Sequence, residues 1–202
     1  MAENKVFFGL DKVHIAFIES TTEAGIPTYG TPIRIPGAVN FSPSPENEES
    51  TFWADNVKYY MSSQNNGYSG DLEMAKFPDA VIAEMLGWIV DKNGALVEIP
   101  DGAVKEFALL AEVSGDQKGL RTIFYKCTGS APSFSPSTTT ETKEPTTQTM
   151  TIGIAPSNLG IDLGFGPNQY VTKAHIEFDA ANHAKWDTFF TEVYMPEVTV
   201  TP

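Results

Sequence analysis

The chain has 202 residues, 26 acidic and 13 basic, with a formal net charge of −13. Direct binding of nucleic acid needs clustered Lys and Arg, so this charge argues against that function. The single cysteine, Cys127, excludes an internal disulfide and a cysteine-based zinc site. No run of about 18 apolar residues predicts a membrane span, and the polar N-terminus does not resemble a secretion signal.

The N-terminal part of the chain predicts two strands and a loop. Apolar and polar residues alternate over Val6–Glu19, which is typical of a half-buried strand. A second strand over Ile33–Val39 is expected to be kinked or ended by Pro36-Gly37. Residues 42–50 contain two prolines and the glutamates Glu46, Glu48 and Glu49, and this composition predicts an extended loop.

An aromatic-rich segment and a hairpin follow. Thr51–Met61 is a strand candidate with a bulge or bend at Asp55-Asn56. Asn65-Asn66-Gly67 predicts a hairpin turn, because Asn and Gly tolerate the left-handed backbone that such turns need. The strand after it, Tyr68–Lys76, alternates so that Asp71 and Glu73 lie on one face and Leu72 and Met74 on the other.

The spacing of apolar residues changes after Pro78 and predicts a short helix that ends near Gly87. Its apolar residues are Val81, Ile82, Met85, Leu86 and Ile89. Another hairpin turn is expected at Lys92-Asn93-Gly94. Beyond it, Phe107–Val113 and Leu120–Cys127 indicate an antiparallel pair of strands.

Low-complexity sequence precedes the last predicted elements. Ser130–Thr149 is rich in Ser, Thr and Pro, which predicts an extended loop. Strands are expected at Met150–Ala155 and Tyr170–Phe178, and a helix at about residues 180–194. We therefore predict one mainly β domain over residues 1–195, an antiparallel β-sandwich or barrel with one or two short flanking α-helices, and an extended tail over residues 196–202.

The sequence contains no pattern that indicates catalysis. The three histidines lack metal-ligand spacing, and the glycines match neither a phosphate-binding loop nor a nucleophile elbow. Asp71 and Glu73 are a carboxylate pair, but such pairs far more often line a solvated surface than perform acid–base work. We predict no catalytic, cofactor or metal residues and no enzyme.

Several segments, in this order and at this spacing, resemble the phi13-type family of phage major tail proteins, which build the tail tubes of long-tailed, non-contractile bacteriophages. The resemblance covers most of the chain. The segments that carry it are Val6–His14, Thr28–Pro32, Ile35–Val39, Phe52–Asn56 with Tyr59-Tyr60, Asn66–Glu73, Phe107–Leu110 and Glu144–Thr149.

The resemblance implies a structural protein of the virion tail, made in the host bacterial cytoplasm. Such subunits form hexameric rings that stack into a hollow tube, with a β-sandwich fold of the tail-tube type and a flanking helix. The implied partners are other copies of the chain and the tail tip, tape measure and tail terminator proteins. Phage DNA passes through the lumen without specific binding. Residues 196–202 are then either a simple tail or the beginning of a linker to an immunoglobulin-like domain.

The residues agree with this resemblance in three respects. An acidic subunit suits a channel that must not hold DNA, and Asp71 and Glu73 are lumen candidates, with a solvated outer face as the alternative. Unpaired sheet edges can be completed by a neighbouring copy. The two predicted loops are candidates for contacts between subunits or rings, through Glu46, Glu48, Glu49, Phe134, Thr139, Glu141 and Lys143.

Two alternatives remain open from the sequence. One is the tube of a contractile tail or a secretion system, which shares the general fold. The other is a carbohydrate-binding or adhesion module, for which Trp53, Tyr59, Tyr60 and Tyr68 would supply an aromatic platform.

Overall fold

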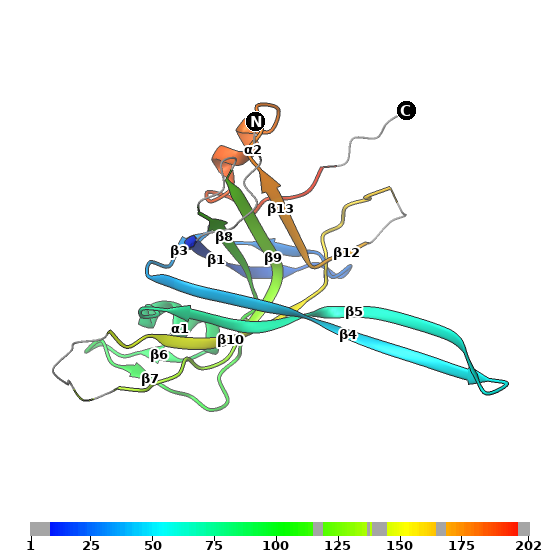
Figure 1. Cartoon of the computed structure of the whole chain (residues 1–202). Helices are drawn as coiled ribbons and strands as arrows, with labels where there is room; N and C mark the ends of the chain where they lie inside the picture. The colour runs from blue at the N-terminus through cyan, green and yellow to red at the C-terminus, as the bar shows by residue number, and fades with distance from the viewer. Residues whose placement is uncertain (1–8, 115–118, 137, 139–144, 165–168, 198–202) are drawn as a thin grey trace.

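The structure is a computed structural model that describes residues 9–114, 119–136, 138, 145–164 and 169–197 (Figure 1). The longer strands in these residues are β1 (Leu10–Thr21), β4 (Ala38–Ala54), β5 (Val57–Met74), β8 (Phe107–Val113), β9 (Leu120–Gly129), β10 (Gln148–Ala155) and β13 (Lys173–Glu177). The short ones are β2 (Pro27–Tyr29), β3 (Ile33–Arg34), β6 (Ile89–Val90), β7 (Leu96–Val97), β11 (Ser157–Asn158) and β12 (Tyr170–Val171). The helices are α1 (Asp79–Leu86) and α2 (His183–Thr188).

The fold is mainly β and antiparallel with two short helices, which confirms the predicted class. The main sheet has nine strands in the order β2-β1-β8-β9-β10-β5-β4, with β3 pairing with β1 and β13 pairing with β9. This sheet does not close into a barrel. Strand β4 therefore lies at one edge of the sheet.

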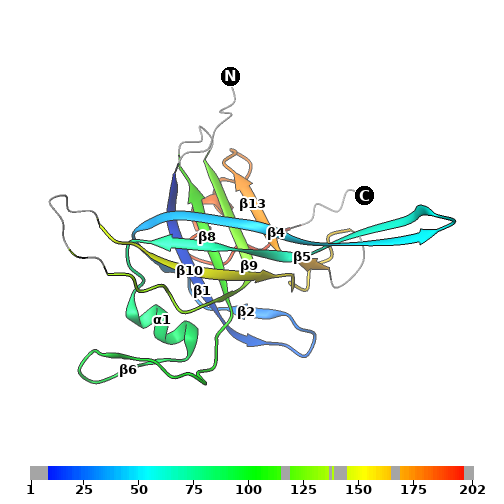
Figure 2. The same ribbon diagram turned by 60° about the horizontal axis from the view of Figure 1, so that its bottom comes forward.

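Strand β9 divides the sheet into two layers. Its first half, Leu120–Phe124, pairs with β13, whereas Lys126–Gly129 pairs with β10. Figures 1 and 2 show the consequence, since β4, β5 and β10 cross over β1, β8 and β9 at a large angle. The two layers enclose an apolar space between them.

Side chains that alternate between the two faces of the strands fill this space and also form a second core on the opposite face. Val13, Ile15 and Phe17 of β1 belong to the main core between the layers, and Leu109 and Phe124 join them. Successive strand residues point to opposite faces of a sheet, so their neighbours face the other way. These neighbours, with Tyr125 and Ile123 among them, form a second core that the C-terminal segment covers. Strands β1, β8 and β9 are thus buried on both faces.

Helix α1 confirms the predicted helix and caps the main core. Pro78 precedes it with an extended backbone, Asp79 lies in its first turn, and Val81, Ile82 and Met85 are buried. The helix ends because Gly87 adopts the left-handed conformation, with φ 67°. Ile89, which the spacing placed on the helix, consequently begins β6, and the hairpin turn at residues 92–94 joins β6 to β7 as predicted.

The C-terminal helix is shorter than predicted, because α2 covers only residues 183–188 of the expected 180–194. The Asn182 side chain accepts a hydrogen bond from the Asp179 N–H and forms a turn before the helix. At the other end, Arg121 donates to the carbonyl oxygen of Trp186, and the Tyr125 hydroxyl donates to that of Tyr194. These contacts fix residues 186–194 against the second core in a mostly non-helical path.

Cationic and aromatic groups anchor this C-terminal segment. The Arg121 guanidinium lies 3.9 Å from the Trp186 ring centroid, and its Nε is 2.7 Å from Glu112 Oε2. The His14 ring stacks on Phe190 at 4.5 Å, and its Nδ1 donates to the Lys12 carbonyl oxygen at 2.7 Å. Burial, and then the charges of Arg34, Arg121 and Lys12, lower the pKa of His14 against the opposing effect of its backbone hydrogen bond.

This arrangement predicts a loss of stability in mild acid. Because the folded-state pKa of His14 lies below the unfolded value of about 6.5, protonation favours the unfolded chain. The stabilisation is complete above that value and is lost as the pH falls below it. Denaturant unfolding at pH 7.5 and 5.5 should show a smaller pH effect in His14→Gln than in the parent. The exposed His175→Gln is the control, and an unchanged pH effect in His14→Gln would contradict the assignment.

Most remaining strand predictions are confirmed with shifted ends. Strand β1 starts at Leu10, and residues 6–8 of the predicted first strand lie outside the described residues. The kink at Pro36-Gly37 separates β3 from β4, and Phe107–Val113 pairs with β9 as expected. Tyr68–Lys76 corresponds to the end of β5, and the last two predicted strands to β10 and to β12 with β13.

The hairpin of β4 and β5 overturns three predictions. Residues 42–50 are a regular part of β4 and not a loop, and Asn65-Asn66-Gly67 lies within β5 and not in a turn. Thr51–Met61 is not one strand with a bulge or bend, because Asp55-Asn56 is the turn between β4 and β5. Its φ angles are 53° and 60°, as in the two-residue connections that match strand twist. Prolines are tolerated in β4 because it is an edge strand, whose outward N–H groups bond to no other strand among the described residues.

The Ser/Thr/Pro-rich segment is an extended loop only in part. Gln148 and Thr149 belong to β10. Ser130 and Ser133 hydrogen-bond to Thr151 and Thr149, so residues 130–133 run along the edge of β10. Residues 137 and 139–144 lie outside the described residues.

Candidate functional site: a projecting arm and a polar sheet face

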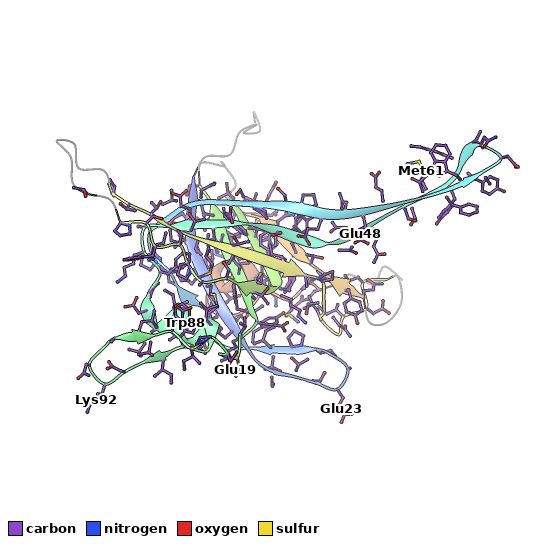
Figure 3. The ribbon with its side chains drawn as sticks, turned by 90° about the horizontal axis from the view of Figure 1, so that it is seen from below. Glu19, Glu23, Glu48, Met61, Trp88 and Lys92 are labelled. Carbon is purple, nitrogen blue, oxygen red and sulfur yellow. The ribbon has the colours of Figure 1, made fainter. Side chains whose placement is uncertain are left out.

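The distal half of the β4–β5 hairpin leaves the body of the protein as a two-stranded ribbon, which we call the arm (residues 46–67). Strand β10 pairs with β5 only as far as Ile154 opposite Tyr68. Beyond that point β4 and β5 pair only with each other, from Asn47 opposite Asn65 to Ala54 opposite Val57. Figure 3 shows the arm projecting from the body, with Glu48 along its length and Met61 near its end. Within the described residues, no further strand pairs with the arm, and an isolated two-stranded ribbon is only marginally stable in water.

The end of the arm is apolar. We define the arm tip as Phe52, Trp53, Val57, Tyr59, Tyr60 and Met61. Each is more than half exposed, and Tyr59 reaches 72%. Isolated exposed apolar residues are ordinary, whereas a contiguous group of large ones marks an interaction surface.

Apolar groups occupy both faces of the arm tip. Phe52 lies directly opposite Tyr60 on one face, and Thr51 opposite Met61 on the other. Trp53 follows Phe52 and therefore shares the second face, where its ring lies 5.8 Å from Lys58 Nζ. The register shifts between Phe52 and Trp53 and leaves Tyr59 as the extra residue of a bulge. A ribbon that is apolar on both faces cannot be covered by packing one face onto its own body.

A bulge in β5 marks the point where the arm begins. Pro45 pairs with Tyr68, but Asn47 pairs with Asn65, so one residue of β4 lies opposite two residues of β5. The stretch Asn65-Asn66-Gly67 supplies the extra residue. The Asn65 side chain accepts a hydrogen bond from the Gly67 N–H at 2.9 Å, and Gly67 has φ 129°. The Asn-Gly signal in the sequence therefore reports a change in strand direction.

Three of the predicted contact residues lie on the arm. Glu46, Glu48 and Glu49 are exposed between the body and the arm tip. Glu48 and Glu49 are successive strand residues and point to opposite faces, so both sides of the arm are acidic. These residues remain candidates for contacts between copies, on a strand in place of the predicted loop.

The two lumen candidates lie where alternation predicts. Asp71 is exposed and Glu73 is half-buried on the outer face of β5, while Leu72 and Met74 point into the main core. Thr151 Oγ1 donates to Asp71 at 2.8 Å, and Thr147 Oγ1 donates to Glu73 at 2.5 Å. The two carboxylates are held in fixed positions by hydroxyl donors.

The layer that carries these carboxylates is almost free of cations. Strands β4, β5 and β10 contain no Arg and a single Lys, Lys58 at the arm tip. The same strands contain five carboxylates, which are those of Glu46, Glu48, Glu49, Asp71 and Glu73. The charged groups of this layer are therefore almost all negative, and hydroxyl groups accompany Asp71 and Glu73 on its outer face.

The other predicted contact residues lie on the Ser/Thr/Pro-rich segment. Phe134 is 84% exposed and follows the residues that run along β10. It lines a shallow hollow with Lys76 and Pro136. Thr139, Glu141 and Lys143 lie outside the described residues.

The aromatic residues proposed as a sugar platform do not gather on one surface. Trp53 and Tyr60 lie on opposite faces of the arm tip. Tyr68 lies in the body, where its ring packs at 6.2 Å from Phe124 and lies 4.8 Å from Lys173 Nζ. This arrangement does not favour stacking of one sugar chain on all four rings.

Within the described residues, no group of three or more His, Cys, Asp or Glu side chains could hold a metal ion. Burial raises the pKa of the Cys127 thiol well above its usual range, which keeps the thiol protonated. In the same part of the chain, no helix is both long and apolar enough to cross a membrane.

No protein-family model matches the chain, and no curated protein matches it.

Proposed function

We propose that the chain is the structural subunit of a bacteriophage tail tube, and that it assembles into stacked hexameric rings around a DNA-conducting channel. Support comes from the resemblance of the ordered segments to phage major tail proteins, from the arm and from the sheet layer of β4, β5 and β10, which is almost free of cations. The proposed partners are further copies and the tail tip, tape measure and tail terminator proteins. The proposed location is the virion tail, after assembly in the host cytoplasm.

The arm is the observation that carries the proposal. A projecting ribbon with apolar groups on both faces is costly to expose, so a protein that builds one needs a partner to enclose it. A subunit that repeats many times in a tube supplies that partner at every position. Among the described strands, none pairs with the outer edge of β4, so a neighbouring sheet can be added there.

The polar sheet layer suits the wall of the channel. Six copies of a layer whose charges are mostly carboxylates would surround the DNA with negative charge, and a narrow passage strengthens repulsion. Asp71 and Glu73 would face the lumen, with their carboxylates held by Thr151 and Thr147. DNA could then slide without forming lasting contacts.

Negative-stain electron microscopy of the concentrated protein, together with its native mass, tests the proposal. We expect rings or hollow tubes with six subunits per turn, if necessary after addition of a tail-tip nucleus. A stable dimer or trimer that never polymerises, with or without the nucleus, would overturn the proposal.

The same tubes test the channel wall. Asp71→Lys with Glu73→Lys changes these two positions from −2 to +2 in each subunit. Tubes of this variant should retain short duplex DNA at low salt and release it as salt rises, because phosphate binding displaces counterions. Tubes of Asp71→Asn with Glu73→Gln are the control and should retain none. If the two variants bind DNA equally, Asp71 and Glu73 do not face the lumen.

A further inference from the structure

The sequence contains the pair Asn-Gly twice, as Asn66-Gly67 and as Asn93-Gly94. Asparagine followed by glycine is especially prone to spontaneous deamidation, because glycine has no Cβ and its backbone nitrogen is open to the asparagine side chain. Both asparagines are exposed, so solvent reaches both side chains. The backbone around each pair therefore decides which asparagine reacts.

Asn93-Gly94 lies in the turn of the β6–β7 hairpin. The Gly94 N–H donates to the Asp91 carbonyl oxygen at 3.0 Å, and Gly94 has φ 84°, as in a three-residue hairpin loop that ends in a left-handed glycine. Strands β6 and β7 have 2 residues each and form a sheet of their own, which opens locally at low cost. Figure 3 shows Lys92, the residue before Asn93, at the outer end of this hairpin.

The space around the two glycines differs as well. A Cβ atom at Gly94 would meet nothing within 4 Å, so the Asn93 side chain has room to approach the Gly94 nitrogen once the turn opens. Gly67 is buried, and a Cβ atom there would lie 2.0 Å from the carbonyl oxygen of Ile154. Strand β10 thus lies directly against the Gly67 backbone.

Hydrogen bonds also restrain the Asn66-Gly67 pair. The Gly67 N–H, whose nitrogen would have to attack, donates to the Asn65 side chain at 2.9 Å. Asn65 and Tyr68, on either side of the pair, are both paired with β4. Reaction at Asn66 therefore requires a local opening of the main sheet, which costs more than the opening of an exposed turn.

The Asp91 carboxylate couples Asn93 to the shape of the turn. Its Oδ1 accepts hydrogen bonds from the Asn93 and Ala95 N–H groups, both at 2.8 Å. Its Oδ2 accepts one from Asn93 Nδ2 at 3.0 Å. If a carboxylate replaced the Asn93 carboxamide, this donor would become a second negative group beside Asp91, and attraction would become repulsion.

We propose that Asn93 is a site of spontaneous deamidation, and that the reaction loosens the β6–β7 hairpin. The Gly94 nitrogen bonds to the carboxamide carbon of Asn93, the bond from that carbon to Nδ2 breaks, and ammonia leaves with the Gly94 amide proton. Water then opens the succinimide ring and gives aspartate or isoaspartate. Either product adds a negative charge, and no oxidant or reductant takes part. This chemistry needs no assembly and is independent of the proposed function.

Isoaspartate changes the hairpin more than aspartate does. Its main chain runs through the former side-chain carbonyl, so it gains a carbon atom between residues 93 and 94. The bond from the Gly94 N–H to the Asp91 carbonyl and the 2.9 Å bond from the Asp91 N–H to the Ala95 carbonyl cannot both survive this insertion. Because Leu96 packs against the main core, a distorted turn also weakens the attachment of the hairpin to the body.

Peptide mass spectrometry tests the site, since replacement of NH2 by OH changes the mass. The folded protein is kept in warm, mildly alkaline buffer and sampled over time. We expect deamidation at Asn93 at least about tenfold faster than at Asn66, because the turn opens more readily than the sheet. Asn93→Gln is the control and should stay unmodified at position 93, because a longer side chain closes its ring more slowly.

The same measurement on the protein unfolded in urea separates fold from local sequence. The two Asn-Gly pairs should then react at similar rates, since only the folded chain distinguishes them. Equal rates in the folded protein, or faster reaction at Asn66, would overturn the assignment of Asn93. The same preference for Asn93 in urea would show that the fold does not select the site.

Hydrogen exchange of residues 89–97 tests the loosening. Protein that contains isoaspartate at position 93, separated by chromatography, should exchange the Gly94 and Ala95 N–H groups about tenfold faster or more than the parent, because the turn opens more often. Asn93→Asp adds the charge without the longer main chain and should show a smaller increase. Exchange in α1 should be unchanged. Parent-like exchange in the isoaspartate form would overturn the loosening.

Discussion

Replacing Trp53, Tyr59 and Tyr60 together by serine is expected to abolish tube assembly and to leave the folded monomer intact. The three side chains are 58–72% exposed in the single chain, so the main core does not depend on them. Enclosing each by a partner would remove roughly 100 Å² of apolar surface from water, or about 2–3 kcal/mol. Losing all three should therefore weaken each contact by about 5 kcal/mol or more, which is three to four orders of magnitude in affinity.

Electron microscopy and thermal unfolding of the triple variant separate assembly from folding. Tyr170→Ser is the matched control, because Tyr170 is 70% exposed and lies outside the arm on β12. Its tubes should be normal. If the triple variant still forms tubes at the parent concentration, the arm tip is not an assembly contact, and the central argument for self-association fails.

The parts of the fold that the sequence predicted are those where periodicity and turn chemistry agree. Phe107–Val113 is buried along most of its length, and α1 has helical spacing that begins after Pro78 and ends at Gly87. The predicted length of the C-terminal helix was wrong because the aromatic residues of this region have the spacing of an apolar helix face. They are in fact held by Arg121 and Tyr125, which are distant in the sequence. Local patterns do not report such tertiary contacts.

The β4–β5 hairpin could not be predicted because its local signals pointed to other structures. Pro43 and Pro45 argue against a strand in general, yet an edge strand accepts them. Asn65-Asn66-Gly67 is a stronger turn signal than Asp55-Asn56, but the first became a bulge and the second the turn. The aromatic residues on either side of Asp55-Asn56 were a usable signal, since they pair across the hairpin as Phe52 with Tyr60.

The sequence predicted residues of the candidate site, such as Asp71 and Glu73, but not the contacts that surround them. Alternation placed Asp71 and Glu73 opposite Leu72 and Met74, and the structure confirms that split between the outer face and the core. Their hydroxyl partners are Thr151 of β10 and Thr147, which immediately precedes β10; they come 80 and 74 residues later in the chain than Asp71 and Glu73. Their pairing with β5 depends on the register of the sheet, which a single sequence does not specify.

Gly67→Ala is expected to destabilise the protein strongly and to change the direction of the arm. A Cβ atom at Gly67 would lie 2.0 Å from the carbonyl oxygen of Ile154, and the backbone there has φ 129°. Neither side of this clash is a flexible side chain, so β5 and β10 must separate where the arm begins. Positive φ costs about 1–3 kcal/mol for a residue with a side chain, and the overlap with backbone should bring the total above about 3 kcal/mol.

Gly25→Ala separates the cost of the positive φ from the cost of the overlap with backbone atoms. Gly25 also has positive φ, 79°, but a Cβ there would meet nothing within 4 Å. The Gly25→Ala variant should therefore lose only the stability that the positive φ costs, about 1–2 kcal/mol. It should form tubes normally at a temperature well below its unfolding midpoint. Denaturant unfolding measures the difference between the two variants, and hydrogen exchange of residues 57–74 shows whether the strands have parted. Equal destabilisation by both substitutions would mean that Gly67 does not pack against Ile154, and that the bulge does not determine where the arm points.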